Sequence, residues 1–227
     1  DYARSRSEVD AGRIALWGTS FSGGHVVVIA ANDERIACIS AQCPSMDGRA
    51  NLLKLMRAGT PGSGLKILVH AQRDLVRSWL RLSPHKIPIV GTPGSVALLT
   101  TEDSLEGYSR FASVDFVNEA CARIALRADK YRPVTHAGDV RCPGLFLICE
   151  HDSLLDNEAA EETARQLGGE ATVRRYPIGH FDIYHDEHFE RAVAEQIAFF
   201  TENLTAQEEA KEEKDASRNP VTDRNTG

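Results

Sequence analysis

Four short apolar runs, each bounded by glycine or proline, constrain the fold more than any other feature of the sequence. They are residues 13–17, 36–41, 145–149 and 171–176. Their brevity and their content of branched aliphatic residues are typical of buried strands. Helical patterns at His25–Ala31 and Asn157–Leu167, and from about Asp186 to Asn203, separate or follow them. Strands that alternate with helices predict an α/β fold with a parallel sheet covered on both faces.

Residues 49–140 interrupt this alternation and predict an inserted helical cap. They contain helical patterns at Leu65–Leu82 and Val114–Arg127, with Ile87–Val90 as the only candidate strand. The core is therefore expected in two pieces, residues 1–48 and residues 141–204. Residues 205–227 contain ten charged residues and a single sizeable aliphatic one, Val221. Such a segment buries too little apolar surface to order itself, so we expect a disordered acidic tail.

The composition restricts the classes of partner and the cellular compartment that we expect. The formal net charge is -7 and the arginines are scattered, which argues against a nucleic-acid-binding surface. No apolar run approaches the roughly 18 residues of a membrane span, so we expect no membrane partner. The five cysteines include no C-x-x-C pair, which argues against a zinc site or a disulfide framework and favours the cytoplasm. A small-molecule substrate is the expected partner, and the sequence leaves the oligomeric state open.

The segment from Gly18 to Gly24, Gly-Thr-Ser-Phe-Ser-Gly-Gly, lies between a predicted strand and a predicted helix. A nucleophile at such a sharp turn needs small residues two positions before it and two after it. Gly18 and Ser22 meet this requirement around Ser20, which we predict to be the nucleophile. A second register makes Ser22 the nucleophile instead. In the preferred register the N–H of Phe21 contributes to an oxyanion hole at the helix N-terminus. A phosphate-binding loop is not favoured, because no Gly-Lys-Ser/Thr follows.

A serine nucleophile needs a base and an orienting carboxylate, in the chain order Ser, Asp, His. Asp152 follows the third apolar run and His180 follows the fourth, which predicts both at one edge of the sheet. Asp152 is also a candidate helix cap, and Glu150 and Asp156 are alternative orienters. His185 and His188 are alternatives to His180. These histidines lie among acidic residues, but a solvated helix face explains them better than a metal does, so we predict neither metal nor cofactor.

Three segments together resemble the α/β-hydrolase superfamily, in particular members grouped with its Xaa-Pro dipeptidyl-peptidase-like and dienelactone-hydrolase-like branches. The segments are Leu16–His25, Ile148–Asp152 and Tyr176–Tyr184. The resemblance implies Ser20 as nucleophile, Asp152 as orienter and His180 as base. Dienelactone hydrolases proper use a cysteine nucleophile, so their own activity is not implied.

The resemblance also raises an expectation about completeness. The sheet of the family usually has eight strands, with the nucleophile after the fifth, whereas about 12 residues precede Arg13 here. We therefore expect the C-terminal part of an α/β-hydrolase sheet, truncated at its N-terminal side and without the early loop that gives the second oxyanion donor. The predicted function is a serine hydrolase that cleaves a small ester, thioester or amide through an acyl-enzyme on Ser20. The alternatives are a catalytically impaired fragment of such a hydrolase and an acyltransferase that uses the same triad.

Overall fold

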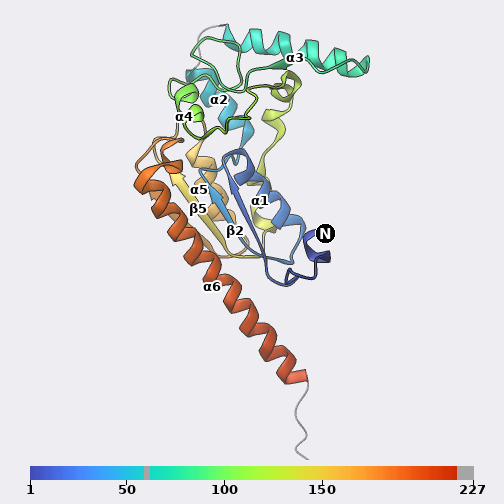
Figure 1. Cartoon of the computed structure of the whole chain (residues 1–227), viewed down its shortest axis with the longest axis vertical. Coiled ribbons are helices and arrows are strands. Elements are labelled where there is room, and N and C mark those ends of the chain that lie inside the picture. Colours follow the sequence, from blue (N-terminus) through green and yellow to red (C-terminus); the bar gives the residue numbers. More distant parts are fainter. Residues whose placement is uncertain (59–61, 219–227) are drawn as a thin grey trace, which may run out of the picture.

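A computed structural model describes residues 1–58 and 62–218 of the chain and contains a four-stranded parallel sheet (Figure 1). The strands are β1 (Ile14–Thr19), β2 (Ile36–Gln42), β5 (Gly144–Cys149) and β6 (Ala171–Tyr176), in the order β1-β2-β5-β6. Every neighbouring pair is parallel. The α/β fold and the four strands expected from the sequence are thus confirmed.

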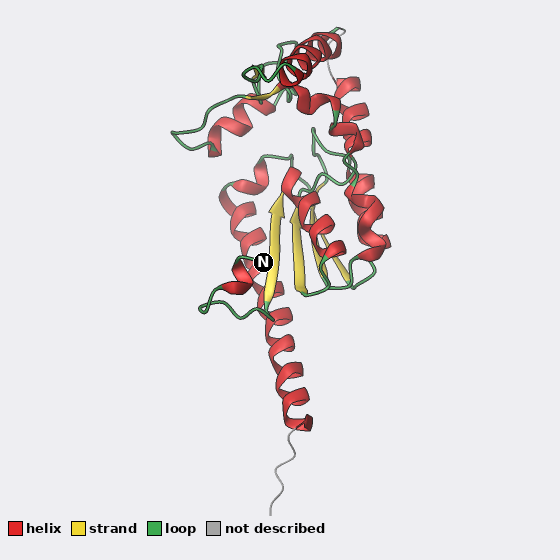
Figure 2. Ribbon diagram, turned by 90° about the vertical axis from the view of Figure 1, so that its right-hand side faces the viewer, coloured by secondary structure: helices red, strands yellow, loops and turns green. Residues whose placement is uncertain are grey.

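Helices cover both faces of this sheet, as Figure 2 shows. On one face lie α1 (Phe21–Asn32), α5 (Asn157–Gln166) and the 3₁₀ helix η4 (Pro133–Asp139). Helix α6 (Asp186–Arg218) covers the other face, after the 3₁₀ helix η5 (Asp182–Tyr184). Side chains alternate along β5, so that Phe146 faces α1 and α5 while Leu145 and Leu147 pack in the cluster under α6. Burial of β5 on both faces explains why its sequence is continuously apolar.

The segment between β2 and β5 forms a separate group of elements beyond the carboxyl ends of the strands, at the top of Figure 1. It contains α2 (Gly48–Ala58), α3 (Ser63–Trp79) and α4 (Ser104–Phe111). A two-stranded antiparallel ribbon joins β3 (Lys86–Ile87) to β4 (Ala120–Cys121), and the 3₁₀ helices η2 (Ala122–Leu126) and η3 (Ala128–Lys130) follow. The last 3₁₀ helix before β5, η4, packs against α1 and α5 of the core. The chain starts with the short 3₁₀ helix η1 (Ala3–Ser5).

Two local predictions were wrong. Residues 114–127 form no α-helix, because Ala120 and Cys121 pair with β3 and the N–H of Ala122 donates to the carbonyl of His85 at 3.0 Å. Helix α6 does not end near Asn203 but continues to Arg218, so residues 205–218 are helical rather than disordered. This stretch is rich in Ala, Glu, Gln and Lys, which are strong helix formers, and it extends a helix that is already nucleated. Residues 219–227 of the predicted tail lie outside the described residues. In the part of the chain that the structure describes, no helix is long and apolar enough to cross a membrane.

Candidate active site

Ser20 occupies the turn between β1 and α1 in a strained backbone conformation. Its φ is 52° and its ψ is -121°, an arrangement that residues other than glycine rarely adopt. Two hydrogen bonds hold the strained residue: its N–H donates to the carbonyl of Gln42 at 2.9 Å, and its carbonyl accepts from the N–H of Ser45 at 2.9 Å. Strain of this kind persists only where the surroundings enforce it, and it is frequent at active sites.

The residues two before and two after Ser20 explain why the turn tolerates this sequence. A Cβ atom on Gly18 would lie 2.2 Å from the carbonyl oxygen of Ser22, so only glycine fits there. The Ser22 hydroxyl donates to the carbonyl of Thr19 at 2.7 Å and accepts from the N–H of Thr19 at 2.9 Å. Ser22 therefore fastens the turn through both hydrogen-bonding directions of its hydroxyl. This geometry favours the register in which Ser20, and not Ser22, is the reactive residue.

Asp152 and His180 meet at the carboxyl ends of β5 and β6. His180 Nδ1 lies 2.6 Å from Asp152 Oδ2, and both side chains are buried. The other carboxylate oxygen, Oδ1, accepts from the N–H groups of Leu154 and Leu155, each at 2.8 Å. Asp152 thus closes a tight turn with one oxygen and orients the imidazole with the other. The N-cap of α5 is Asp156, which accepts from the N–H of Ala159 at 2.9 Å.

The other candidates lie apart from this pair. The side chain of Glu150 is exposed, and Asp156 is occupied as a helix cap. His188 lies on α6, 3.9 Å from Glu187, and His185 is the residue that precedes this helix. Among the sequence candidates, the structure brings His180 and Asp152 into direct contact. Within residues 1–58 and 62–205 it assembles no group of three or more His, Cys, Asp or Glu side chains suited to a metal ion.

Cys43 is a neighbour of His180 that the sequence analysis did not identify. It follows β2 with a φ of 33°, and only 2% of its surface is exposed. Its sulfur lies 3.3 Å from the hydroxyl of Tyr184, which in turn lies 2.6 Å from the hydroxyl of Thr19. The available signal was its position directly after a strand, at the same edge of the sheet as Asp152 and His180.

The charges around His180 change its acidity. Burial disfavours the imidazolium, but the neighbouring Cys43 sulfur and the Asp152 carboxylate outweigh burial and raise the pKa of His180 above its ordinary value. Burial likewise opposes ionisation of Cys43, yet its hydrogen bonds with Cys149 and His180 lower the pKa of this thiol. Cys43 and Asp152 therefore stabilise positive charge on His180, which is the charge that a general base acquires during proton transfer.

Two polar contacts tie the segment between β2 and β5 to the Asp152 turn, and neither was visible in the sequence. Lys54 Nζ on α2 donates to the carbonyls of Asp152 and Leu155, at 2.7 and 2.6 Å. The Ser153 hydroxyl donates to the Asp103 carboxylate at 2.8 Å. Because residues 54 and 103 come from distant parts of the sequence, the turn that carries Asp152 is held from two sides.

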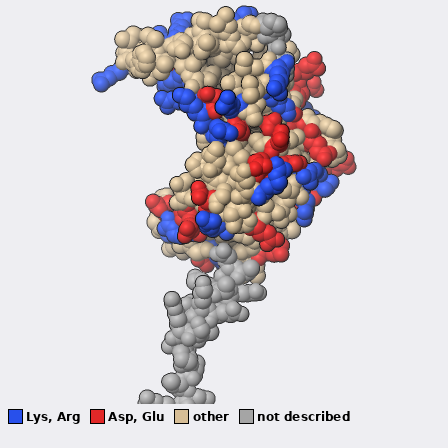
Figure 3. Space-filling view, turned by 180° about the vertical axis from the view of Figure 1, so that it is seen from behind, with Lys and Arg blue, Asp and Glu red and all other residues tan. Residues whose placement is uncertain are grey.

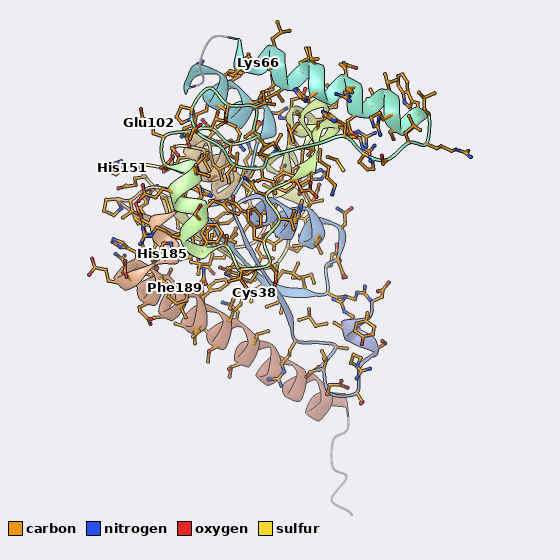
Figure 4. All side chains as sticks on the ribbon, turned by 45° about the horizontal axis from the view of Figure 1, so that its top comes forward. Cys38, Lys66, Glu102, His151, His185 and Phe189 are labelled. Carbon is orange, nitrogen blue, oxygen red and sulfur yellow. The ribbon has the colours of Figure 1, made fainter. Side chains whose placement is uncertain are left out.

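Helix α4 adds an aromatic wall beside His180. The ring of Phe111 lies 5.0 Å from Tyr184 and 6.2 Å from Phe181, and Phe181 lies edge-on to His180 at 5.1 Å. Gly107 allows this approach, because a Cβ atom there would lie 2.3 Å from the Phe181 ring. Figure 4 shows His185, from the loop that carries His180, beside the green α4. The site is therefore bordered by apolar rings on the side of α4.

Comparison with known proteins identifies the fold. No family model matches the chain. Among solved structures, the chain resembles DcsB, determined in complex with its substrate analogue, at a TM-score of 0.70 and 20% identity over 89% of this chain and 69% of DcsB. It also resembles the α/β hydrolase GrgF from Penicillium sp. sh18, at a TM-score of 0.63 and 20% identity over 87% of this chain and 66% of GrgF. The chain therefore has the α/β-hydrolase fold.

The chain is also similar in sequence to a curated protein. The quorum-quenching protein AidA of Acinetobacter baumannii (strain MDR-ZJ06) is 34% identical over 200 residues, which are 87% of this chain and 64% of AidA. The chain thus spans less than two thirds of the length of this relative.

Proposed function

We propose that the protein is a serine hydrolase that cleaves a small ester, thioester or amide through an acyl-enzyme on Ser20. The observation that carries the proposal is the buried 2.6 Å contact between His180 Nδ1 and Asp152 Oδ2, at the sheet edge where Ser20 occupies its strained turn. Since Nδ1 is held by the carboxylate, we assign the role of general base to Nε2, which must exchange the hydrogen bond between His180 and Cys43 for one with Ser20.

The proposed reaction has two halves. Ser20 Oγ attacks the substrate carbonyl while His180 Nε2 accepts its proton, and the imidazolium then delivers that proton to the leaving group. Water attacks the resulting acyl-enzyme, with His180 again accepting and returning the proton. Phe21 begins α1, so its N–H has no acceptor within the helix and is available to the developing oxyanion, which the helix dipole also favours.

The aromatic wall supports a substrate with an apolar part. Phe111, Phe181 and Tyr184 border the base, and Phe21, next to the nucleophile, is 48% exposed. Pockets lined by such rings favour apolar ligands, with a few polar groups that fix their orientation. Because the relative AidA is described as a quorum-quenching protein, signal molecules with an ester or amide bond are the first substrates to test.

The free thiols of the chain support a reducing compartment. All five cysteines are unpaired, and disulfides are rare in the cytosol, where thiols are kept reduced. We propose the cytoplasm as the location in which the hydrolase acts.

Labelling with a fluorophosphonate probe tests the nucleophile. We expect Ser20→Ala to abolish labelling, since Ser20 is the residue of this turn that has the strained backbone conformation. The matched control is Ser22→Gly, which keeps a small residue at this position and should retain labelling. Cys43→Ala should also retain it, because the proposed nucleophile is the Ser20 hydroxyl and not the buried thiol. Undiminished labelling of Ser20→Ala, or its loss in Ser22→Gly with the fold intact, would contradict the assignment.

A further inference from the structure

The outward face of α3 is apolar and uncovered. Leu65, Leu68, Val69, Val76 and Trp79 recur at intervals of three, four and seven residues, which places them on one side of the helix. All five are exposed, with Trp79 at 72%, Leu65 at 67% and Val69 at 61%. Figure 1 shows α3 at the outer end of the molecule, far from the sheet. A soluble helix ordinarily turns such a stripe towards the core, so its exposure calls for a partner.

The opposite face of α3 explains why the stripe points outwards. Asp74 on that face is completely buried, and its carboxylate accepts from the N–H groups of His85 at 2.7 Å and Arg123 at 3.0 Å. Ala71, one turn earlier, is equally buried. Rotating the helix to bury the apolar stripe would expel Asp74 and leave two backbone donors without partners, which costs free energy for each group. The orientation of α3 is therefore specified by its polar contacts.

The charge around the stripe is strongly positive, although the whole chain is acidic. Residues 62–82 contain four basic residues and one acidic residue, the buried Asp74, whereas the chain has a net charge of -7. Lys66, Arg73 and Arg77 lie seven and four residues apart and follow one flank of the apolar stripe. Figure 3 shows Lys and Arg bordering a broad uncharged surface on this part of the molecule, and Figure 4 labels Lys66 on α3.

We propose that α3 binds the surface of an anionic lipid bilayer, with its apolar stripe in the acyl–headgroup boundary and its basic flank against the lipid headgroups. Apolar residues with a tryptophan on one side and Lys and Arg beside them are the features of helices that lie in the membrane plane. At about 1.5 Å per residue, the 17 residues extend roughly 25 Å along that plane.

Charge distinguishes the bilayer from a second copy of the chain as the occupant. A symmetric contact between two α3 helices would bring their basic flanks close together, which disfavours it. An anionic surface attracts the same residues. The expectation of no membrane partner rested on the absence of a spanning segment, and binding at the surface needs none.

Vesicle binding tests the proposal. The chain has two tryptophans, so Trp17→Phe leaves Trp79 as the only indole reporter. With vesicles of phosphatidylglycerol and phosphatidylcholine we expect co-sedimentation and a blue shift of Trp79 fluorescence, and neither with phosphatidylcholine alone. Replacing both Lys66 and Arg73 by Gln should weaken partition about thirtyfold, since each basic residue near an anionic surface contributes about fivefold. Raising the salt concentration should weaken it as well.

A matched pair of apolar variants provides the control. Val69→Ser, within the stripe, should weaken partition about tenfold, whereas Ile197→Ser, equally exposed on α6, should leave it unchanged. Each variant replaces an exposed side chain, and its thermal unfolding is measured to verify the fold. Absence of binding to the anionic vesicles, or equal binding to neutral ones, would overturn the proposal. A dimer in sedimentation equilibrium that Val69→Ser dissociates, without vesicle binding, would identify a second copy as the occupant.

Discussion

Replacing Asp152 with asparagine separates the two tasks of this residue. The carboxamide oxygen can take the place of Oδ1 and accept from the N–H groups of Leu154 and Leu155, so the turn should persist. The amide NH₂ then faces His180 Nδ1 in place of Oδ2. Because this NH₂ donates, Nδ1 must become an acceptor and the proton moves to Nε2. His180 in that tautomer cannot accept the proton of Ser20.

The expected loss of kcat follows from this change of tautomer. A comparable exchange in a Ser-His-Asp triad lowers kcat about 10⁴-fold, which corresponds to about 5.4 kcal/mol in activation free energy. We expect the full loss because both side chains are buried. Water cannot reach His180 Nδ1 to replace the lost hydrogen bond to the Asp152 carboxylate.

The assay is kcat for hydrolysis of a chromogenic acetate ester, measured beside urea unfolding of each variant. We expect Asp152→Asn to unfold cooperatively with stability close to the parent protein, yet to lose activity by about four orders of magnitude. Asp156→Asn serves as the control, because asparagine also caps helices well and Asp156 is a cap only. A loss below about tenfold in Asp152→Asn would refute the assignment of Asp152 as orienter.

Three further predictions concern the surroundings of the proposed triad. Gly18→Ala places a Cβ atom 2.2 Å from a carbonyl oxygen of α1 and should destabilise the fold by about 3 kcal/mol or more; a loss below about 1 kcal/mol in urea unfolding would contradict this close contact. Cys43→Ala removes a neighbour that favours protonation of His180, so the pKa of His180 should fall and the acidic limb of the kcat/KM profile should move to lower pH. An unchanged acidic limb would argue against an electrostatic effect of Cys43 on His180. Lys54→Met removes both hydrogen bonds that hold the Asp152 turn from α2, so Tm and kcat should fall together, and Lys54→Arg should recover part of both.

Local patterns were sufficient to predict the core of the fold. The run 171–176 coincides with β6, and the pattern Asn157–Leu167 ends one residue beyond α5. These elements are specified by periodicity and by glycine and proline at their ends, both of which are local properties. The helix predicted for residues 114–127 was wrong because Ala120 and Cys121 pair with β3, whose residues lie 33 to 35 positions earlier in the chain.

The candidate site divides in the same way. Ser20, Asp152 and His180 each follow a strand, so chain order and strand position made them candidates. The same reasoning left Ser22, Glu150, Asp156, His185 and His188 open as alternatives. Cys43 and Lys54 are not marked by any motif, since their importance arises from the atoms that folding brings next to them. The sequence also could not show that Asp152 both closes a turn and orients His180. A carboxylate in either role has the same position after a strand.

The length of α6 affects how the protein behaves in solution. The helix has 33 residues, or about 50 Å along its axis, and Figure 1 shows it extending beyond the end of the sheet. A compact chain of this size has a radius of gyration of only about 17 Å. The projecting rod increases friction without adding mass, so the monomer should elute from a sizing column ahead of compact standards of 24.9 kDa. A column calibrated with such standards would overestimate the mass of this chain, whereas light scattering or sedimentation equilibrium would return the mass itself.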